Sequence, residues 1–391
     1  MKIRLLILSA LSCLLSTPFE GAPLPVAPGD FTPQPLVEKT ADGFRVPQPG
    51  HRFEFPRDHG SHPEFKVEWW YLTGHLFGPD KERFGFQATF FRKATTPVSA
   101  ESVAGAKAFR ADEIFLFHAA LLEVGSGRFI HTERLARSGW DAGASVEKLS
   151  VHVGEARLRG EESQENRFTL DASIREEGGF SLDLEALKPL VVFGNDGVSR
   201  KGDSPTAASW YLTFPRMKAV GEVRIKDRLV PVEGKVWMDH EISSSQLTGE
   251  QAGWDWAGIQ FEDGREIMVY RLRRKDGTTD PASALAWVDA DGKTTHYGAS
   301  EFKWEASGQW RSPVSGAKYP LPVHLSAPDP ATGKTVEWTL QPLANQQELD
   351  GTVSGVPYWE GACRVLSEGR EVGAAYVELT GYAGALGRAL R

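Results

Sequence analysis

The sequence predicts an all-β protein. Short runs of alternating apolar and polar residues recur along the chain, at about ten residues per run. These runs are rich in Phe, Trp, Tyr and Val, and the 40 glycines of the chain suit the turns between them. Helical periodicity is scarce, and the spacing favours β-barrels or β-sandwiches over parallel sheets. The clearest strand candidates are residues 83–92, 112–124, 167–174, 180–187, 209–214, 265–273 and 374–382.

Residues 1–22 have the features of a secretory signal peptide. A basic start and an apolar stretch precede small residues at Gly21 and Ala22, which offer a cleavage site. Cys13 lies within this segment, but alanine stands where a lipoprotein signal would have leucine, so lipid anchoring is disfavoured. We therefore expect a secreted or periplasmic protein.

The mature chain is expected to begin with a proline-rich lead-in over residues 23–48. Loss of the signal peptide takes the formal net charge from −8 to −10, and no basic cluster is present. This balance argues against nucleic acid or an anionic membrane as partner. Only Cys363 remains, which excludes an intrachain disulfide, so stability must come from burial of a core.

A weak internal repeat predicts two related β domains. Residues 69–93 contain an aromatic strand, a turn and a second strand that ends in arginine and lysine, and residues 254–275 repeat this arrangement. Trp69 then aligns with Trp254. Chance similarity between aromatic hairpins is the alternative. We predict an N-terminal β domain over residues 49–238 and a C-terminal β domain over residues 239–391.

An aromatic strand begins at Glu68. On a strand, Glu68 shares a face with Trp70, whereas Trp69 and Tyr71 share the opposite face. An acid on an otherwise apolar face loses hydration, so its pKa is expected to rise, as a general acid requires. The alternative is a structural glutamate bonded to the backbone or to an arginine, for which Arg92 is the candidate.

Asp58, His59 and His62 lie together in a loop that Gly60 and Pro63 interrupt. Two histidines near a carboxylate could ligate zinc. In a loop, however, spacing constrains geometry poorly, and polar loop residues are usually solvated. We expect no metal here and keep metal binding as an alternative.

A second acidic cluster lies at residues 237–241. On a strand, Trp237, Asp239 and Glu241 face one way and His240 the other. Paired carboxyl groups can hold one proton between them, and a neighbouring histidine can relay it. A ladder of surface ion pairs is the alternative. The histidine is followed by glutamate, but the second histidine of a zinc-protease motif is missing.

Acids flanked by aromatic residues recur in the second half of the chain. This pattern suggests a pocket lined by rings and a few acids, suited to an apolar and unsaturated ligand. No nucleophile elbow, P-loop or dinucleotide-binding motif occurs. The flanked acids are Asp255 between Trp254 and Trp256, Glu360 after Tyr358 and Trp359, and Glu378 between Tyr376 and Tyr382.

Six ordered motifs between Phe53 and Tyr382 resemble the AttH family of secreted hydrolases, which is related to the carotenoid 1,2-hydratases. The resemblance implies two lipocalin-like β-barrels side by side, in agreement with the repeat. It also implies a site around Trp237, Asp239 and His240. The motifs are FPRDHGSHPEFKVEWWYLTGHL, GFQATFFR, VWMDHE, GWDWAGIQFEDGREIMVYRLR, YWEGA and ELTGY.

The hydratase branch adds water across an isoprenoid double bond without a cofactor, which requires an acid, aromatic faces and a positioned water. We therefore predict a cofactor-free, acid-catalysed hydratase, isomerase or hydrolase of an apolar, isoprenoid-like or lipid-like molecule. Asp239 is the expected proton donor and His240 its relay, with Glu241 and Glu68 as further acids. The expected substrate-binding residues are Trp237, Trp254, Trp256, Tyr270, Trp70, Tyr71, His59, His62, Trp359 and Glu360.

The alternative is a periplasmic lipid-binding or isoprenoid-binding module in which the acids are structural. An export signal is unusual for a pigment-pathway enzyme and favours the secreted branch of the family. Because members of that branch are often associated with ABC-type export systems, the resemblance implies an ABC-type envelope permease as a further partner.

Overall fold

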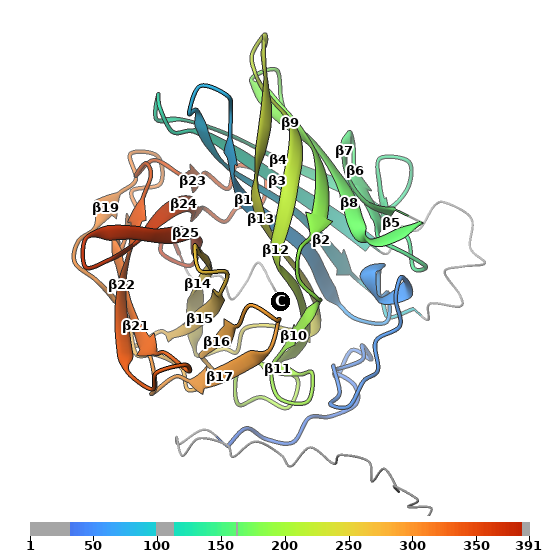
Figure 1. Ribbon diagram of the computed structural model, residues 1–391. Helices are drawn as coiled ribbons and strands as arrows, with labels where there is room; N and C mark the ends of the chain where they lie inside the picture. Colours follow the sequence, from blue (N-terminus) through green and yellow to red (C-terminus); the bar gives the residue numbers. More distant parts are fainter. Residues whose placement is uncertain (1–31, 99–112, 162, 385–391) are drawn as a thin grey trace, which may run out of the picture.

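Figure 1 shows the computed structural model, which describes residues 32–98, 113–161 and 163–384. The predicted signal peptide and the first part of the lead-in lie outside the described residues. The fold is all-β, as the sequence predicts: two large antiparallel sheets lie side by side, with a small two-stranded ribbon and the 3₁₀ turn η1 (Arg57–His59). No helix in the described part of the chain has the length and apolar character needed to cross a membrane.

The first sheet is a near-closed barrel. Its path runs β4-β3-β2-β1-β13-β12-β9-β8-β7-β6-β5, and the short strands β10 and β11 pair with β12 outside this path. The edge strand β4 contacts β6 and β8, which brings the two ends of the path together. The strands are β1 (Val67–Phe77), β2 (Arg83–Ala94), β3 (Glu113–Glu123), β4 (Arg128–Arg137), β5 (Ala142–Ala144), β6 (Ser150–Val153), β7 (Ala156–Glu161), β8 (Gln164–Ile174), β9 (Gly178–Ala186), β10 (Val191–Phe193), β11 (Ser199–Arg200), β12 (Ala208–Ile225) and β13 (Arg228–Ser245).

The second sheet follows the path β17-β16-β15-β14-β25-β24-β22-β21-β18, with β23 paired to β24. It curves around a core of its own, and the ribbon of β19 and β20 accompanies it (Figure 1). The strands are β14 (Gln251–Phe261), β15 (Glu266–Arg274), β16 (Ala284–Val288), β17 (Thr294–Gly298), β18 (Lys303–Ala306), β19 (Trp310–Arg311), β20 (Lys318–Tyr319), β21 (Val323–Pro328), β22 (Thr335–Pro342), β23 (Glu348–Leu349), β24 (Tyr358–Ser367) and β25 (Arg370–Leu379).

The two copies of the sequence repeat occupy equivalent places. β1–β2 and β14–β15 are both antiparallel hairpins, and each hairpin is formed by the first two strands of its sheet along the chain. In each sheet the first strand also pairs with the last, β1 with β13 and β14 with β25. Each of the seven runs that the alternation pattern marked falls on a strand of the structure.

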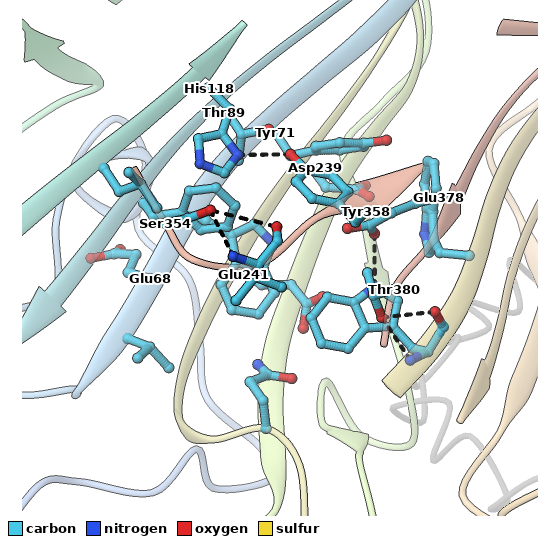
Figure 2. Close-up of a pocket in the computed structure, with 18 of the residues that line it drawn as sticks. Glu68, Tyr71, Thr89, His118, Asp239, Glu241, Ser354, Tyr358, Glu378 and Thr380 are labelled. Carbon is cyan, nitrogen blue, oxygen red and sulfur yellow. Dashed lines mark hydrogen bonds between the residues drawn. The ribbon is translucent and has the colours of Figure 1, made fainter. Parts of the chain in front are cut away.

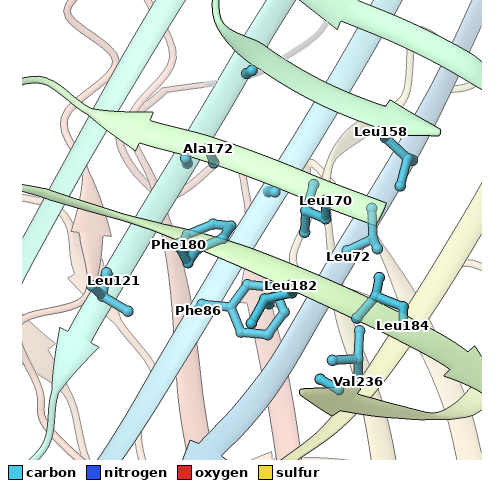
Figure 3. Close-up of a cluster of buried hydrophobic side chains, with 14 of the residues drawn as sticks. Leu72, Phe86, Leu121, Leu158, Leu170, Ala172, Phe180, Leu182, Leu184 and Val236 are labelled. Carbon is cyan, nitrogen blue, oxygen red and sulfur yellow. The ribbon is translucent and has the colours of Figure 1, made fainter. Parts of the chain in front are cut away.

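Strand alternation divides the buried residues of the first barrel between two environments. Residues such as Leu72 and Phe86 point into the barrel, where Figure 3 shows them packing beneath Leu170 and Leu182 of β8 and β9. Their neighbours on the opposite face, including Tyr71, join a separate cluster against the second sheet. The same strands therefore supply both a barrel core and a wall of the inter-sheet region.

The two sheets make close contact through small residues. A Cβ atom added to Gly85 of β2 would lie 2.5 Å from the Cβ atom of Ala362 of β24, so only glycine fits there. The chain passes from one sheet to the other between Ser245 and Gln251. This is several residues after the predicted domain boundary at 238/239, because β13 continues to pair with β1 through Ser243 and with β12 through Ser245.

Candidate active site

A cavity of about 350 Å³ lies between the two sheets. One wall comes from β1, β2, β3 and β13 of the first barrel, and the other comes from β14, β15, β24 and β25 of the second sheet. Figure 2 shows acidic and aromatic side chains from both walls pointing toward the same space. Most of the exposed lining is apolar, so each polar group in it is a candidate for recognition or chemistry.

The strand register arranges the first wall in rows. Directly paired residues on neighbouring strands share a face, with Cβ atoms about 5 Å apart. One row across the first barrel is polar and runs Thr213, Asp239, Tyr71, Thr89 and His118. The next row is mostly apolar; it runs Tyr211, Glu241, Trp69, Phe91, Leu116 and Leu135.

Asp239 lies between Thr213 and Tyr71 in the polar row and is 3 % exposed. Three neutral groups donate hydrogen bonds to its carboxyl oxygens: the hydroxyl of Tyr211 (2.7 Å), the hydroxyl of Thr213 (2.6 Å) and the indole N–H of Trp237 (2.7 Å). Burial raises the pKa of Asp239 to about 7, although these hydrogen bonds work in the opposite direction. At neutral pH Asp239 can therefore both give and accept a proton.

The second wall contributes a pair of carboxyl groups. Glu360 on β24 and Glu378 on β25 are directly paired across the strands and share a face. The Tyr71 hydroxyl donates to Oε1 of Glu360 at 2.6 Å, and the indole N–H of Trp254 donates to Oε2 of Glu378 at 2.7 Å. Burial raises the pKa of Glu378 to about 7, and burial together with the neighbouring Glu378 raises the pKa of Glu360 well above its usual value.

A buried ion pair borders the same cavity. Lys201 Nζ lies 3.1 Å from Oε2 of Glu241 and sits over the rings of Tyr211 and Tyr270, at 4.7 and 4.3 Å from their centroids. The Tyr270 hydroxyl lies 3.0 Å from the hydroxyl of Ser199. Glu241 is therefore partnered by a cation, unlike Asp239, Glu360 and Glu378.

Glu68 belongs to a different network. It is fully buried, and its oxygens accept hydrogen bonds from Arg92 Nε (3.0 Å), from the hydroxyl of Ser61 and from the backbone N–H of His62. Oε1 also lies 2.9 Å from Nδ1 of His62 and 2.8 Å from Nε2 of His240. Burial alone would raise the Glu68 pKa, but Arg92 and the two histidines outweigh it and hold the pKa well below its usual value. The predicted rise in the Glu68 pKa is therefore wrong, and the alternative partner, Arg92, is confirmed.

The side-chain donors of His62, Glu68 and His240 lie within 4.8 Å of one another, close enough to suggest a metal site. The donor set does not fit one well. The Arg92 guanidinium sits 3.0 Å from Glu68, where it would repel a cation, and Nε2 of His62 is already 3.2 Å from Oδ1 of Asp58. We interpret the cluster as a buried hydrogen-bonded ion network.

Sequence comparison places the chain in a family. The sequence model of the AttH-like family matches residues 46–382, most of the chain. The protein belongs to the AttH-like family. This confirms the resemblance seen in its motifs. No curated protein sequence matches the chain.

Solved structures share the fold of this AttH-like protein. A candidate AttH from Nitrosomonas europaea is 32 % identical, has a TM-score of 0.75, and its alignment covers 86 % of this chain and 98 % of that one. Kievitone hydratase from Nectria haematococca is 14 % identical with a TM-score of 0.65, over 90 % and 98 % of the two chains. CghA is 13 % identical with a TM-score of 0.50, over 90 % and 98 %. At these lower identities the likeness shows the fold alone.

The structure brings together more than half of the residues that the sequence nominated. The cavity is lined by the acids Glu68, Asp239, Glu241 and Glu360 and by the aromatic residues Tyr71, Trp254, Trp256 and Tyr270. Trp237 is not part of the cavity lining, but its indole N–H donates a hydrogen bond to Asp239.

His240 and Trp70 lie on the opposite face of their strands. The His240 ring stacks on Trp70 at 4.9 Å and bonds to Glu68, so His240 is not placed to relay a proton to Asp239. His59 packs against Phe55 and Phe214.

Trp359 is fully buried in the core of the second sheet, where its indole N–H donates to the carbonyl of Asn345. The adjacent Glu360 faces the cavity, as expected from alternation along β24.

Several cavity residues were absent from the sequence-based site. Tyr211 lies on β12, and the strand register brings its hydroxyl to Asp239. Lys201 lies in the loop before β12, and only the folded chain brings it to Glu241. His118 is buried beside Tyr358, with Nδ1 2.8 Å from the tyrosine hydroxyl, and burial lowers its pKa to about 4. Glu378 had a sequence signal, since it sits between two tyrosines, and so had Trp69 and Tyr358, which belong to aromatic clusters beside an acid.

Proposed function

We propose that this AttH-like protein is a cofactor-free enzyme that adds water to, removes water from or shifts a carbon–carbon double bond of an apolar small molecule. The observation that carries the proposal is the geometry of Asp239. It is a buried carboxyl group with neutral hydrogen-bond donors only and a pKa of about 7, and it lines an aromatic cavity. A proton donor of this kind can protonate an alkene carbon at neutral pH.

The remaining requirements of such a reaction are supplied by neighbouring groups. Protonation of an alkene leaves a carbocation, which the faces of Tyr71 and Trp256 can stabilise. The two rings meet edge to face at 5.2 Å beside Asp239. Glu378 on the opposite wall can accept a proton from the attacking water or from the cation. The name of kievitone hydratase, which shares the fold, is consistent with this chemistry.

The test uses a panel of apolar isoprenoids with terminal or conjugated double bonds. Each is incubated with the protein in ¹⁸O-labelled water, and products are detected by mass spectrometry. Wild type should give a labelled alcohol from at least one member. Asp239→Asn should lower that rate by about 10²–10⁴-fold, because the amide cannot donate the proton. Activity should also fall as pH rises through about 7, since the donor must be protonated.

A matched control separates catalysis from folding. Asp183→Asn makes the same change on an exposed position of β9, outside the cavity, and should leave activity unchanged. Quenching of tryptophan fluorescence by a non-reactive polyene checks that Asp239→Asn still binds ligand. Full activity of Asp239→Asn would contradict the assignment.

The apolar lining also fits a second candidate, a lipid or isoprenoid carrier that serves an ABC-type envelope permease. For a carrier, mass spectrometry of molecules extracted from the native protein would find one apolar compound, released unchanged. For an enzyme, the extract should contain a pair of compounds that differ by one water or by a double-bond position.

A further inference from the structure

Glu360 has one carboxyl oxygen without a partner. Oε1 accepts the hydrogen bond from Tyr71, but Oε2 is buried and has no hydrogen-bond partner among the described residues. The side chain is 0 % exposed, yet it belongs to the lining of the cavity. A buried polar atom left unpaired costs about 1–3 kcal/mol. Such an atom at a cavity wall therefore points to a group of the bound molecule.

The surroundings of Glu360 determine which kind of group that is. Glu378 faces it from β25, Tyr71 from β1, and Tyr376 and Tyr358 add hydroxyl groups from β25 and from β24 itself. No lysine or arginine in the described part of the chain forms an ion pair with Glu360. A second carboxyl group at the paired position disfavours the charged form.

The hydrogen-bonding pattern is consistent with a neutral acid. Tyr71 donates to Oε1, so that oxygen plays the role of the carbonyl, and a proton on the carboxyl group would reside on Oε2. Burial and Glu378 raise the pKa of Glu360 well above its usual value, which favours the protonated form. Oε2 is then a donor without an acceptor.

We propose that Glu360 stays a neutral carboxylic acid and donates a hydrogen bond from Oε2 to a carbonyl oxygen of the bound molecule. The ligands of this cavity are then apolar ketones or enones, and pure hydrocarbons bind less well. The inference rests on the proposed function for the place of the ligand, and it narrows the substrate class. A donor to the carbonyl oxygen would also polarise a conjugated double bond toward attack by water.

The experiment compares two probes of the same shape. One is β-ionone, an apolar enone, and the other is the hydrocarbon in which a methylene group replaces its ketone oxygen. Affinities follow from quenching of protein tryptophan fluorescence. Wild type should bind the ketone about tenfold more tightly, the value of one hydrogen bond of about 1.4 kcal/mol.

Two variants identify the donor. Glu360→Gln should keep the preference for the ketone, because the amide N–H replaces the acid O–H while the amide oxygen still accepts from Tyr71. Glu360→Met should lose the preference and keep its affinity for the hydrocarbon. If Glu360→Gln instead binds the ketone much more tightly than wild type, Glu360 is charged and the proposal is wrong. A Glu360→Met variant that retains the preference would also overturn it.

A spectroscopic measurement covers the case in which Glu360→Met does not fold. Infrared difference spectra at about pH 8, where Asp239 and Glu378 are mostly ionised, should show a protonated carboxyl band in wild type. The band should shift when β-ionone binds and vanish in Glu360→Gln. Its absence from wild type would refute a neutral Glu360.

These measurements are independent of turnover. Asp239→Asn should keep the ketone preference, since the donor to the carbonyl is a different residue. A protein that converts no substrate but retains the preference would contradict the proposed function and leave this inference standing. A protein that converts hydrocarbons but shows no preference for the ketone would contradict this inference and leave the proposed function standing.

Discussion

The two faces of the β1–β13 pair hold buried acids with opposite electrostatic surroundings. Glu68 and Asp239 lie on adjacent strands and are 0 % and 3 % exposed. Glu68 also borders the cavity, but it shares its strand face with Trp70 of the barrel core and meets Arg92 and two histidines, and its pKa falls. Asp239 points into the inter-sheet cavity and meets only neutral donors, and its pKa rises to about 7.

Burial is common to both acids, so burial does not decide their charge. The decisive difference is whether a cation lies within hydrogen-bonding distance. One residue step along a strand turns a side chain to the other face, which is enough to separate a structural ion network from candidate acid–base groups. The comparison therefore predicts different responses to mutation and pH on the two faces.

The largest effect is expected from removing the cation on the barrel face. Arg92→Met leaves the Glu68 carboxylate buried beside two histidines without its main compensating charge. Loss of one partner of a buried ion pair typically costs about 3–5 kcal/mol in unfolding free energy. Denaturant unfolding monitored by tryptophan fluorescence would measure this loss.

The matched control is an arginine at the surface. Arg167 pairs with Glu185 at 3.4 Å, with both side chains more than two-fifths exposed. Arg167→Met should therefore cost less than about 1 kcal/mol. If the two variants lost equal stability, the Glu68 network would have no special structural role.

The pH dependence of stability should differ in sign between the two faces. The Glu68 pKa is lowered by folding, so its network stabilises the protein above its unfolded pKa of about 4.5 and loses this effect as pH falls through the folded value. The Asp239 pKa is raised from 3.8 to about 7, so its contribution is complete below about pH 4 and is lost as pH rises to about 7.

Two variants make this difference measurable. Asp239→Asn should become more stable relative to wild type as pH rises from about 5 to about 8, because the amide never ionises. Glu68→Gln should be less stable than wild type throughout that range, and the difference should shrink below about pH 4.5 as the wild-type carboxylate is protonated. Parallel profiles for the two variants would show that the faces are equivalent after all.

Alternation along single strands made much of this arrangement predictable from the sequence. It placed Trp237, Asp239 and Glu241 on one face and His240 on the other, as observed. A relay from His240 to Asp239 conflicts with that alternation, and the structure shows the conflict directly, since His240 bonds to Glu68.

The sequence did not decide the charge state of either acid, although it offered Arg92 as a partner for Glu68, because the charge depends on the partners that the register brings together. Glu68 lies directly opposite Arg92 across β1 and β2, whereas Asp239 lies opposite Thr213 across β13 and β12. Both registers join segments separated in sequence. Contacts between the sheets, such as Tyr71 with Glu360, join residues that lie even farther apart.

The smallest effect separates two buried threonines on β12 and β1, the two strands that flank β13. Thr213 donates to Oδ1 of Asp239 at 2.6 Å, whereas the hydroxyl of Thr73 has no hydrogen-bond partner in the described part of the structure. Thr213→Val should cost about 1 kcal/mol and raise the Asp239 pKa further, because a donor that favours the carboxylate is lost.

Thr73→Val makes the same chemical change at a hydroxyl that satisfies nothing, so its effect should lie within about 0.5 kcal/mol of zero or be stabilising. Denaturant unfolding at several pH values measures both quantities, since a raised Asp239 pKa shifts the pH-dependent loss of stability upward. The Thr213→Val curve should therefore move to higher pH and the Thr73→Val curve should not. If both curves stayed in place, the Thr213 hydroxyl would not act on the charge of Asp239, and burial alone would account for its raised pKa.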